Sequence, residues 1–397
     1  MAVLVRPSLV TVSDPVTVQA ASVRAYIDNT LTELLHELSL PPSEGRPSIT
    51  LRRRSNIATY AINRQNGALE AHSKVLHRTY SWPGNSAYEA WRFCDANGTT
   101  DIEEVSHLVQ YKRSDIVFII REIIRDIYYI DPAYFKSQNV VDNIVDDLAY
   151  TIGVERAALN VEAAGKGLIT GPFTLRRGSQ VVMDARFSSQ DNLIPRIQED
   201  DEIDISGTRW ILIIEKEAVF HRLARDSYHT TALAGQGLLI TGKGYPDLCT
   251  RAFVHHILCA ASSGNRRPPP VYALVDGDPD GISIMSTYKY GSMAHSHENA
   301  RFVIPNLQYL GLRVSDAVIN SELLENISLL ALTPRDRRKI VSMLQNSPIW
   351  AADGPEPEWR VELQRMMMLN LKAEIEILYE REGGLKGWID QIMFRQA

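Results

Sequence analysis

Acidic residues follow two of the most apolar runs in the chain and are the first candidates for chemistry. Glu215 comes directly after residues 209–214 (RWILII), and Asp276 and Asp278 follow residues 271–275 (VYALV). Such runs are typical of parallel strands covered on both faces, and open α/β sheets bind ligands at the carboxyl ends of their strands. Three oxygen ligands without His or Cys favour Mg²⁺, with Mn²⁺ as the second choice. The sequence predicts a divalent-metal site here, the alternative being aspartates that only cap a turn or helix.

Tyr129 is a candidate nucleophile in the N-terminal half. A tyrosine that attacks phosphorus must ionise a phenol of pKa about 10 or react beside a cation. Arg125 precedes Tyr129 by four residues and shares its face if the segment is helical, where its guanidinium could bind the attacked phosphate. Since the chain holds 16 tyrosines, packing in a core is the alternative.

A glycine-containing segment, residues 241–244 (TGKG), lies between the acids in sequence. It matches only half of a nucleotide-binding phosphate loop, so ATP binding is not predicted. Its backbone amides and Lys243 are candidates to contact a phosphate diester.

The elements that must position these residues are those of a multidomain α/β chain. The length of 397 residues suggests two or three domains. After Asp14-Pro15, apolar residues from Val23 to Leu38 recur at helical spacing. They predict an amphipathic helix that ends near Pro41. Packing on its own domain and docking a partner protein both remain open for this helix.

Further along the chain, the patterns alternate between helix and strand. A helix is predicted over residues 140–148, a turn at Gly153 and a second short helix over residues 154–161. This is the shape of a helix-turn-helix. Residues 165–207 predict strands and loops. Residues 209–281 predict a Rossmann-like alternation of apolar strands and helices. A capped helix is predicted to begin at Thr333, and a long helix over residues 358–380.

Composition narrows the class of protein. The net charge of −6 is not that of a histone-like cation, so a nucleic-acid surface would be a local basic patch. Three cysteines without a CxxC pair argue against a disulfide framework and for a reducing compartment. No apolar run approaches the roughly 20 residues of a membrane span, and the first residues do not resemble a signal peptide. Secreted, membrane and fibrous proteins are therefore not expected.

Together these pieces resemble the topoisomerase VI A-subunit family, which includes the sporulation-type proteins that make meiotic DNA double-strand breaks. The chain looks like a fungal-like member. Residues 125–129 (RDIYY) resemble the tyrosine motif of the family, and residues 215–220 (EKEAVF) and 276–279 (DGDP) resemble the acidic motifs of its Toprim domain. Residues 242–247 (GKGYPD), followed by Thr250-Arg251, are similar to the signature between them. The resemblance runs from about residue 80 to the C-terminus.

The resemblance implies a fold and a set of partners. Residues 1–75 would form an N-terminal helix and a variable arm. Residues 76–175 would form a winged-helix (catabolite-activator-like) DNA-binding domain, and residues 176–397 a Toprim Rossmann-like domain with C-terminal helices. Two chains would form a homodimer with hybrid active sites on double-stranded DNA in the nucleus. The N-terminal helix would then dock a topoisomerase VI B-like subunit, and no membrane would be involved.

The resemblance also assigns roles to residues. Tyr129, rather than Tyr128, would attack a phosphodiester and become linked to the 5′ end, and Arg125 would support the transition state. The remaining candidates are the three metal ligands, Glu215, Asp276 and Asp278, and the three DNA contacts, Lys243, Tyr245 and Arg251.

The chain departs from the family pattern in two places. Position 280 is Asp, where many relatives carry an aromatic residue, which adds a fourth acid near the expected metal. Residues 94–114 are polar and contain Asn97-Gly98, where the family usually continues into an apolar helix. This segment would be explained either by an insertion or by translated non-coding sequence that impairs the domain.

The function expected from the resemblance is metal-dependent DNA transesterification that starts meiotic recombination, by an enzyme whose family is classed with ATP-hydrolysing topoisomerases. Three alternatives stay open. The chain could be the A subunit of a strand-passing type IIB topoisomerase with an ATPase partner, a non-catalytic DNA-binding scaffold, or a Toprim hydrolase that uses water instead of a tyrosine.

Overall fold

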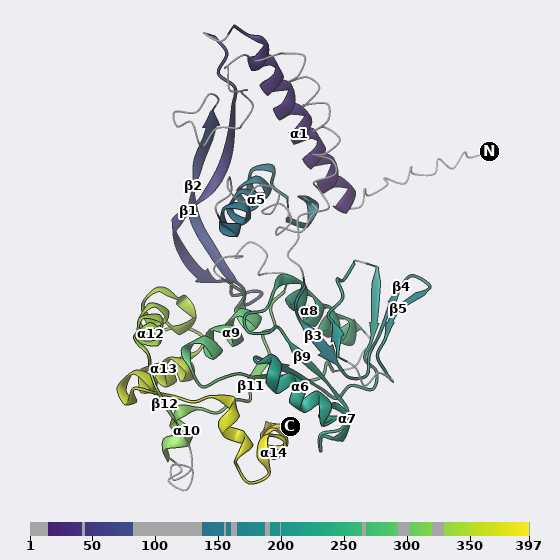
Figure 1. The fold of residues 1–397 in the computed structure, drawn as a ribbon, viewed down its shortest axis with the longest axis vertical. Helices are drawn as coiled ribbons and strands as arrows, with labels where there is room; N and C mark the ends of the chain where they lie inside the picture. The colour runs from purple at the N-terminus through teal and green to yellow at the C-terminus, as the bar shows by residue number, and fades with distance from the viewer. Residues whose placement is uncertain are drawn as a thin grey trace, which may run out of the picture. The chain divides into compact units, whose positions relative to one another are not determined.

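The computed structural model describes residues 15–41, 44–81, 137–154, 156–159, 165–186, 191–198, 200–263, 267–292, 302–319 and 329–396. The chain divides into two compact units (Figure 1): unit 1 holds Met1–Ala58 and Ser73–Ala164, and unit 2 holds Thr59–His72 and Gly165–Ala397. Arg125, Tyr129 and the polar segment 94–114 lie outside the described residues. Among the helices of the described ranges, none combines the length and the apolar character needed to cross a membrane.

Unit 1 contains the predicted amphipathic helix, α1 (Pro15–Ser39). Its residue Val23 is buried in a small apolar cluster with Val141 and Val145 of α5 (Gln138–Ile152). The first half of the apolar stripe therefore packs within its own unit. Further along the helix, Leu35 and Leu38 are 42% and 38% exposed.

The predicted helix and glycine turn around residue 153 are confirmed. Gly153 ends α5 with a φ of 80°, a left-handed conformation that glycine adopts without steric cost. The following η1 (Arg156–Leu159) is a single 3₁₀ turn. Arg156 ties it to α5 through ion pairs with Asp142 and Asp146, at 3.0 and 3.3 Å.

A long β-hairpin lies in the segment where the sequence had shown only a basic cluster and turn signals. Its strands, β1 (Ser48–Ile62) and β2 (Leu69–Ser81), pair with one another in a two-stranded sheet. Gly67 in the connecting turn has a φ of 74°, which explains the Asn-Gly signal. The hairpin was missed because its charged strands lack a clear apolar alternation.

Unit 2 is built on a six-stranded sheet. In order across the sheet, the strands are β11 (Leu307–Tyr309), β10 (Val271–Leu274), β8 (Trp210–Ile214), β9 (Gly237–Thr241), β3 (Leu168–Thr170) and β6 (Asn192–Leu193). The first four are parallel, and β3 and β6 are antiparallel to their neighbours. Every residue of β8, β9 and β10 is buried, so both faces of the sheet are covered, as predicted from the apolar runs.

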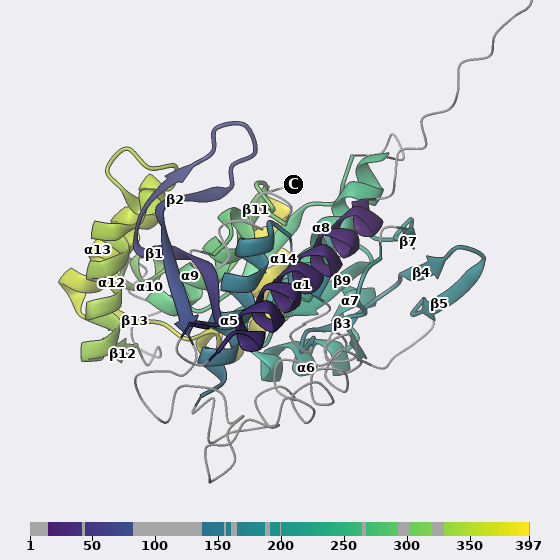
Figure 2. The ribbon, with the colours of Figure 1, turned by 90° about the horizontal axis from the view of Figure 1, so that it is seen from above.

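The other elements of unit 2 surround this sheet (Figure 2). The helices are α6 (Glu217–Arg225), α7 (Tyr228–Thr231), α8 (Leu248–Ser263), α9 (Pro279–Tyr290), α10 (Val314–Ile319), α12 (Pro334–Asn346), α13 (Pro357–Leu369) and α14 (Gly384–Gln396), with a 3₁₀ turn, η3 (Pro348–Trp350). A second sheet has the order β5 (Gln180–Asp184), β4 (Thr174–Arg177) and β7 (Asp201–Asp204). The predicted start of α12 is confirmed, since Thr333 and Asp336 form a reciprocal capping box. The sequence prediction of an α/β chain is therefore correct.

The predicted long helix over residues 358–380 is wrong. Helix α13 ends at Leu369, and Asn370 has a φ of 57°, a left-handed conformation that Asn tolerates better than most residues. The chain then forms β13 (Leu371–Lys372), which pairs with β12 (Leu330–Ala331), and continues into η4 (Ile375–Tyr379). Because the backbone groups of this segment bond to neighbouring strands, they cannot continue the helical ladder.

Gly237 provides a test of how tightly the sheet is packed. A Cβ added to this residue of β9 would lie 2.2 Å from the indole of Trp210, and the ring is held by a 2.8 Å hydrogen bond to the carbonyl oxygen of Gly235. Gly237→Ala is expected to lower the free energy of unfolding by about 1–3 kcal/mol through overpacking. Urea denaturation followed by tryptophan fluorescence measures the change. Gly207→Ala is the control, because its Cβ would meet nothing nearer than 3.7 Å; equal midpoints for the two variants would contradict the prediction.

Candidate functional site

Glu215 and Asp276 are brought together by two neighbouring strands. Ile214 of β8 pairs with Leu274 of β10 in parallel register, so the residues that follow leave the sheet at the same edge. The backbone N–H of Asp276 donates a 2.9 Å hydrogen bond to Oε2 of Glu215. The predicted convergence of these acids at the carboxyl edge is what the structure shows.

Asp278 lies at the N-terminus of α9 and caps it. Its Oδ1 accepts a 2.7 Å hydrogen bond from the backbone N–H of Gly281, so the structural role considered for this residue is real. The bond uses one carboxylate oxygen and therefore does not preclude a second role for the other. Gly281 is required by the tight turn, because a Cβ there would lie 2.3 Å from the carbonyl oxygen of Asp276.

A segment far away in sequence completes the surroundings of Asp276. The backbone N–H of Ile375 donates to Oδ1 of Asp276 at 2.9 Å. Two further hydrogen bonds, between Gly277 and Ala373 at 2.8 and 3.1 Å, join the acidic loop to the same segment. Sequence reasoning missed this contribution, because the segment was expected to be helical.

Lys216 contacts the other oxygen of Asp276. Its Nζ lies 3.1 Å from Oδ2 of Asp276, 2.6 Å from Oε2 of Glu376 and 3.7 Å from Oε2 of Glu374. One cation thus lies among three carboxylates. The sequence places Lys216 near the site, because this residue directly follows Glu215. Nothing in the sequence indicates which acids the lysine would contact.

The electrostatics of the site are those of buried carboxylates that lie next to one another. Burial raises the pKa of Glu215 to about 8, and the charge of Asp276 adds to the effect. Burial also raises the pKa of Asp276 to about 6, against the opposing effect of Lys216. The pKa of Asp278 is raised as well, by burial and by the nearby charge of Asp280. The site has an excess of negative charge that the protein's own groups only partly compensate.

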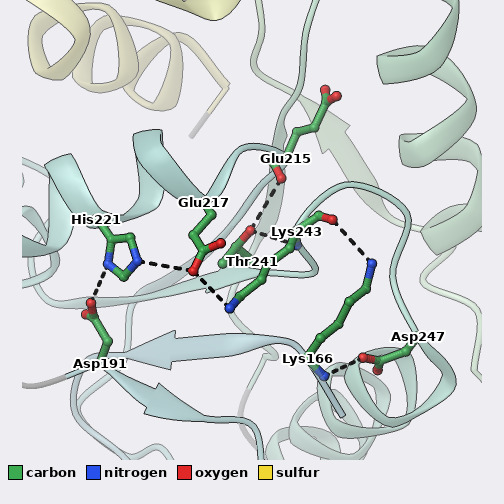
Figure 3. A network of polar contacts seen from close by, with 8 residues as sticks. All are labelled: Lys166, Asp191, Glu215, Glu217, His221, Thr241, Lys243 and Asp247. Carbon is green, nitrogen blue, oxygen red and sulfur yellow. Dashed lines mark hydrogen bonds and ion pairs between the residues drawn. The ribbon is translucent and has the colours of Figure 1, made fainter. Parts of the chain in front are cut away.

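The glycine-containing loop after β9 lies beside Glu215 (Figure 3). The backbone N–H of Gly244 donates to the carbonyl oxygen of Glu215 at 2.9 Å. That of Lys243 donates to Oγ1 of Thr241 at 3.1 Å. Lys243 has a φ of 54°, a strained conformation for a residue with a side chain. Its Nζ forms a 2.9 Å ion pair with Glu217. The loop therefore carries a lysine whose backbone is held by hydrogen bonds to Thr241 and, through Gly244, to Glu215.

Tyr245, the second expected DNA contact, is 42% exposed. Its hydroxyl accepts a 2.5 Å hydrogen bond from Nζ of Lys339 and lies 3.3 Å from Oδ1 of Asp280. Lys339 also forms an ion pair with Asp280, so the additional acid has a cationic partner on α12. The third expected contact, Arg251 in α8, is only 1% exposed, and its side chain does not reach the surface in this conformation.

The chemistry of the donors fits a hard divalent cation. Glu215, Asp276 and Asp278 supply only oxygen ligands, and their raised pKa values indicate a place where added positive charge would be stabilising. Within the residues that the structure describes, however, no set of three His, Cys, Asp or Glu side chains is arranged to hold a metal ion. The donor types match the expected metal, but the described side chains are not drawn together around one point.

Two family models match the chain. The model of the Toprim domain of the topoisomerase 6 A-subunit/Spo11 proteins matches residues 210–384, and the model described as "Type IIB DNA topoisomerase" matches residues 123–161. The first range contains the three acids and the glycine-containing loop. The second contains Arg125 and Tyr129.

Named proteins are similar to much of the chain. The "Meiotic recombination protein rec12" of Schizosaccharomyces pombe is 31% identical over 369 residues, which are 92% of this chain and 93% of that protein. The human "Meiotic recombination protein SPO11" is 34% identical over 64% of this chain and 61% of its own length. The A subunit of DNA topoisomerase 6 from Arabidopsis thaliana is 30% identical over 64% of this chain and 56% of that protein.

The raised pKa of Glu215 predicts a pH-dependent stability in metal-free buffer. The folded state binds this proton more tightly than the unfolded state, so the stabilisation from the protonated group is full below pH 4.5 and is lost as the pH rises toward 8. Glu215→Gln stays neutral while keeping an acceptor for the N–H of Asp276. Above pH 8 the variant is expected to be more stable than the wild type by at least about 1 kcal/mol, and near pH 4.5 the two should be equal.

Urea denaturation at several pH values in EDTA measures this difference. A residual slope below pH 6 is expected in both proteins from Asp276, whose pKa is raised to about 6. A wild type and a Glu215→Gln variant with parallel stability curves from pH 5 to 8 would contradict the assignment of the titrating group.

Proposed function

Because the chain belongs to the topoisomerase 6 A-subunit/Spo11 family, we propose that it makes DNA double-strand breaks in meiosis by transesterification through Tyr129. One observation carries the proposal. Glu215 and Asp276 are held together at the carboxyl edge of the Toprim-matched sheet, in a chain similar over 92% of its length to a meiotic recombination protein. Starting homologous recombination would be the biological result.

The proposed reaction exchanges one phosphodiester for another. The phenolic oxygen of Tyr129 forms a bond to phosphorus, and the bond from phosphorus to the 3′ oxygen breaks. The phenol proton is lost and the 3′ oxygen gains one, so no water is consumed. The products are a 5′-phosphotyrosyl link and a free 3′ hydroxyl. Arg125, from the same motif, would stabilise the charge on the equatorial phosphate oxygens.

The acids would act as the cation site of this reaction. Glu215, Asp276 and Asp278 would hold Mg²⁺ or Mn²⁺, which would neutralise charge on the phosphate and the leaving oxygen. The raised pKa of Glu215 supports this role, because burial and, after it, the charge of Asp276 disfavour the ionised carboxylate, which a bound cation would stabilise.

DNA would lie along the edge formed by the acids and the glycine-containing loop. Lys243 and the exposed Tyr245 would contact it there, as a phosphate-binding cation and a packing surface. Arg251 would reach DNA only after a conformational change, since it is buried in this conformation. Residues 76–175 would form a winged-helix domain that brings Tyr129 to the DNA.

The family also suggests the assembly. In a homodimer with hybrid sites, the tyrosine of one protomer would meet the acids of its partner, so that two chains cut the two strands in the nucleus. The similarity to an Arabidopsis topoisomerase protein favours a second candidate function, the A subunit of a strand-passing enzyme. ATP hydrolysis would then belong to a B-like subunit.

The decisive test is the covalent link itself. Protein recovered from meiotic cells under denaturing conditions is expected to carry DNA ends that can be labelled. Tyr129→Phe should reduce the label below detection, because phenylalanine has no oxygen to bond to phosphorus. Tyr128→Phe is the matched control and should keep the label.

The result also separates the alternatives. Breaks that persist in Tyr129→Phe would point to hydrolysis by the Toprim acids. If the wild type carries no label although it is abundant and bound to chromatin, the catalytic proposal is wrong and the chain is a DNA-binding scaffold. Loss of label in both tyrosine variants would contradict the choice of Tyr129 as the nucleophile.

The exposed end of α1 predicts where a B-like subunit would dock. Leu35 and Leu38 are exposed on the apolar stripe, whereas Val23 packs within unit 1. Leu35→Glu with Leu38→Glu is expected to weaken binding of this partner at least tenfold, because two charges would be buried in an apolar contact. Co-purification from cells measures this, and Thr32→Glu with Ser39→Glu, at exposed polar positions of the same helix, is the control. Unchanged binding in the leucine variant would exclude this surface.

A further inference from the structure

We propose that Lys216 is a built-in counter-ion that competes with the metal for Asp276 and thereby sets the metal concentration at which the acid site fills. The inference deepens the proposed function and rests on it, since it requires that the Toprim acids bind a divalent cation. Lys216 would act as a positioning residue, because it contacts Asp276, a ligand of the expected metal, rather than the DNA.

The first support is the place of the ammonium group. Nζ of Lys216 lies 3.1 Å from Oδ2 of Asp276, while Oδ1 of the same carboxylate accepts from the N–H of Ile375. Both oxygens of Asp276 are therefore engaged by groups of the protein. A divalent ion that binds Asp276 would meet the positive charge of Lys216 at close range.

The second support is that Lys216 has carboxylate partners other than Asp276. Glu376 lies 2.6 Å from its Nζ, and Glu374 lies 3.7 Å from it. If Lys216 leaves Asp276, its charge remains compensated by these two carboxylates. Burial alone would lower the pKa of Lys216, but the bonds to Glu376 and Asp276 outweigh that effect and raise it, so the group stays charged. Competition with a metal therefore occurs through charge and position rather than through loss of a proton.

The third support is the anchoring of the receiving acids. Glu374 and Glu376 belong to the segment that is bonded to the acidic loop through Gly277 and Ala373. That attachment keeps the two carboxylates next to Lys216, whether or not the lysine contacts Asp276. Glu376 would stabilise the displaced lysine and so favour metal binding, although it is not a metal ligand itself.

The geometry thus predicts effects of opposite sign for two neighbouring residues. Lys216→Met removes the competing charge and is expected to lower the dissociation constant for Mn²⁺ about fivefold. Glu376→Gln leaves Asp276 as the better partner of Lys216 and is expected to raise the dissociation constant for Mn²⁺ about threefold. In the double variant, no lysine is present for the side chain at position 376 to hold, so the dissociation constant should equal that of Lys216→Met.

The measurement is titration of the full-length, DNA-free chain with Mn²⁺, with the free ion followed by electron paramagnetic resonance. Lys216→Arg keeps the charge and should stay close to the wild type. Lys386→Met is the matched control for loss of a lysine, because Lys386 is half-exposed and pairs with Asp226 at the surface. Circular dichroism and thermal midpoints in EDTA establish that each variant is folded.

The outcomes separate the inference from the proposed function. If the wild type binds Mn²⁺ but both single variants weaken binding, or neither changes it, Lys216 only supports the fold and the inference is wrong. If the wild type binds no Mn²⁺, or if Asp278→Asn leaves binding unchanged, the acid site itself is refuted and the inference with it. Opposite shifts in the two variants, together with a double variant that matches Lys216→Met, would establish the competition.

Discussion

The burial of carboxylates held close together is the constraint on which the rest of the site depends. Glu215 and Asp276 are joined by a backbone hydrogen bond of 2.9 Å, which keeps two groups of like charge in a place where water screens them poorly. The protein places hydrogen-bond donors and a cation against the carboxylate oxygens. The N–H groups of Ile375 and Gly281 and the ammonium of Lys216 each engage an aspartate oxygen. These contacts offset part of the cost of burying the carboxylates, but burial still leaves their pKa values raised, so the arrangement is suited to an additional cation.

The fold holds these charges in place through the stiffness of a fully covered sheet. Strands β8 and β10 are paired in parallel register and buried on both faces, so neither acid can move away without disturbing the core. The glycine-containing loop is tied to the same edge, through the bond from Gly244 to the carbonyl of Glu215. The loop that carries Lys243, which is expected to contact DNA, is thus held next to Glu215.

The parts of this architecture that depend on local pattern could be predicted from the sequence. The apolar runs of β8 and β10 predicted both the covered strands and the edge at which Glu215 and Asp276 meet, and Thr333 correctly predicted the start of α12. The end of α13 at Asn370 could not be predicted, because the surrounding residues favour a helix and only bonds to β12 and Gly277, far away in sequence, override that preference. For the same reason the contacts of Lys216 with Glu376, 160 residues later, left no signal in the local sequence. The roles of Tyr129 and Arg125 remain predictions from the motif.

The bond from Ile375 to Asp276 spans 99 residues of chain, and this separation has a consequence for biosynthesis. Asp276 leaves the ribosome long before the residue that orients it. Until the segment around Ile375 has been made and has docked, the acidic loop lacks both that donor and the bridge at Ala373. An unfinished chain, or one from a message that stops before codon 373, therefore has its acids but not their final arrangement. For a protein proposed to cut chromosomes, assembly of the site is thereby tied to completion of the polypeptide.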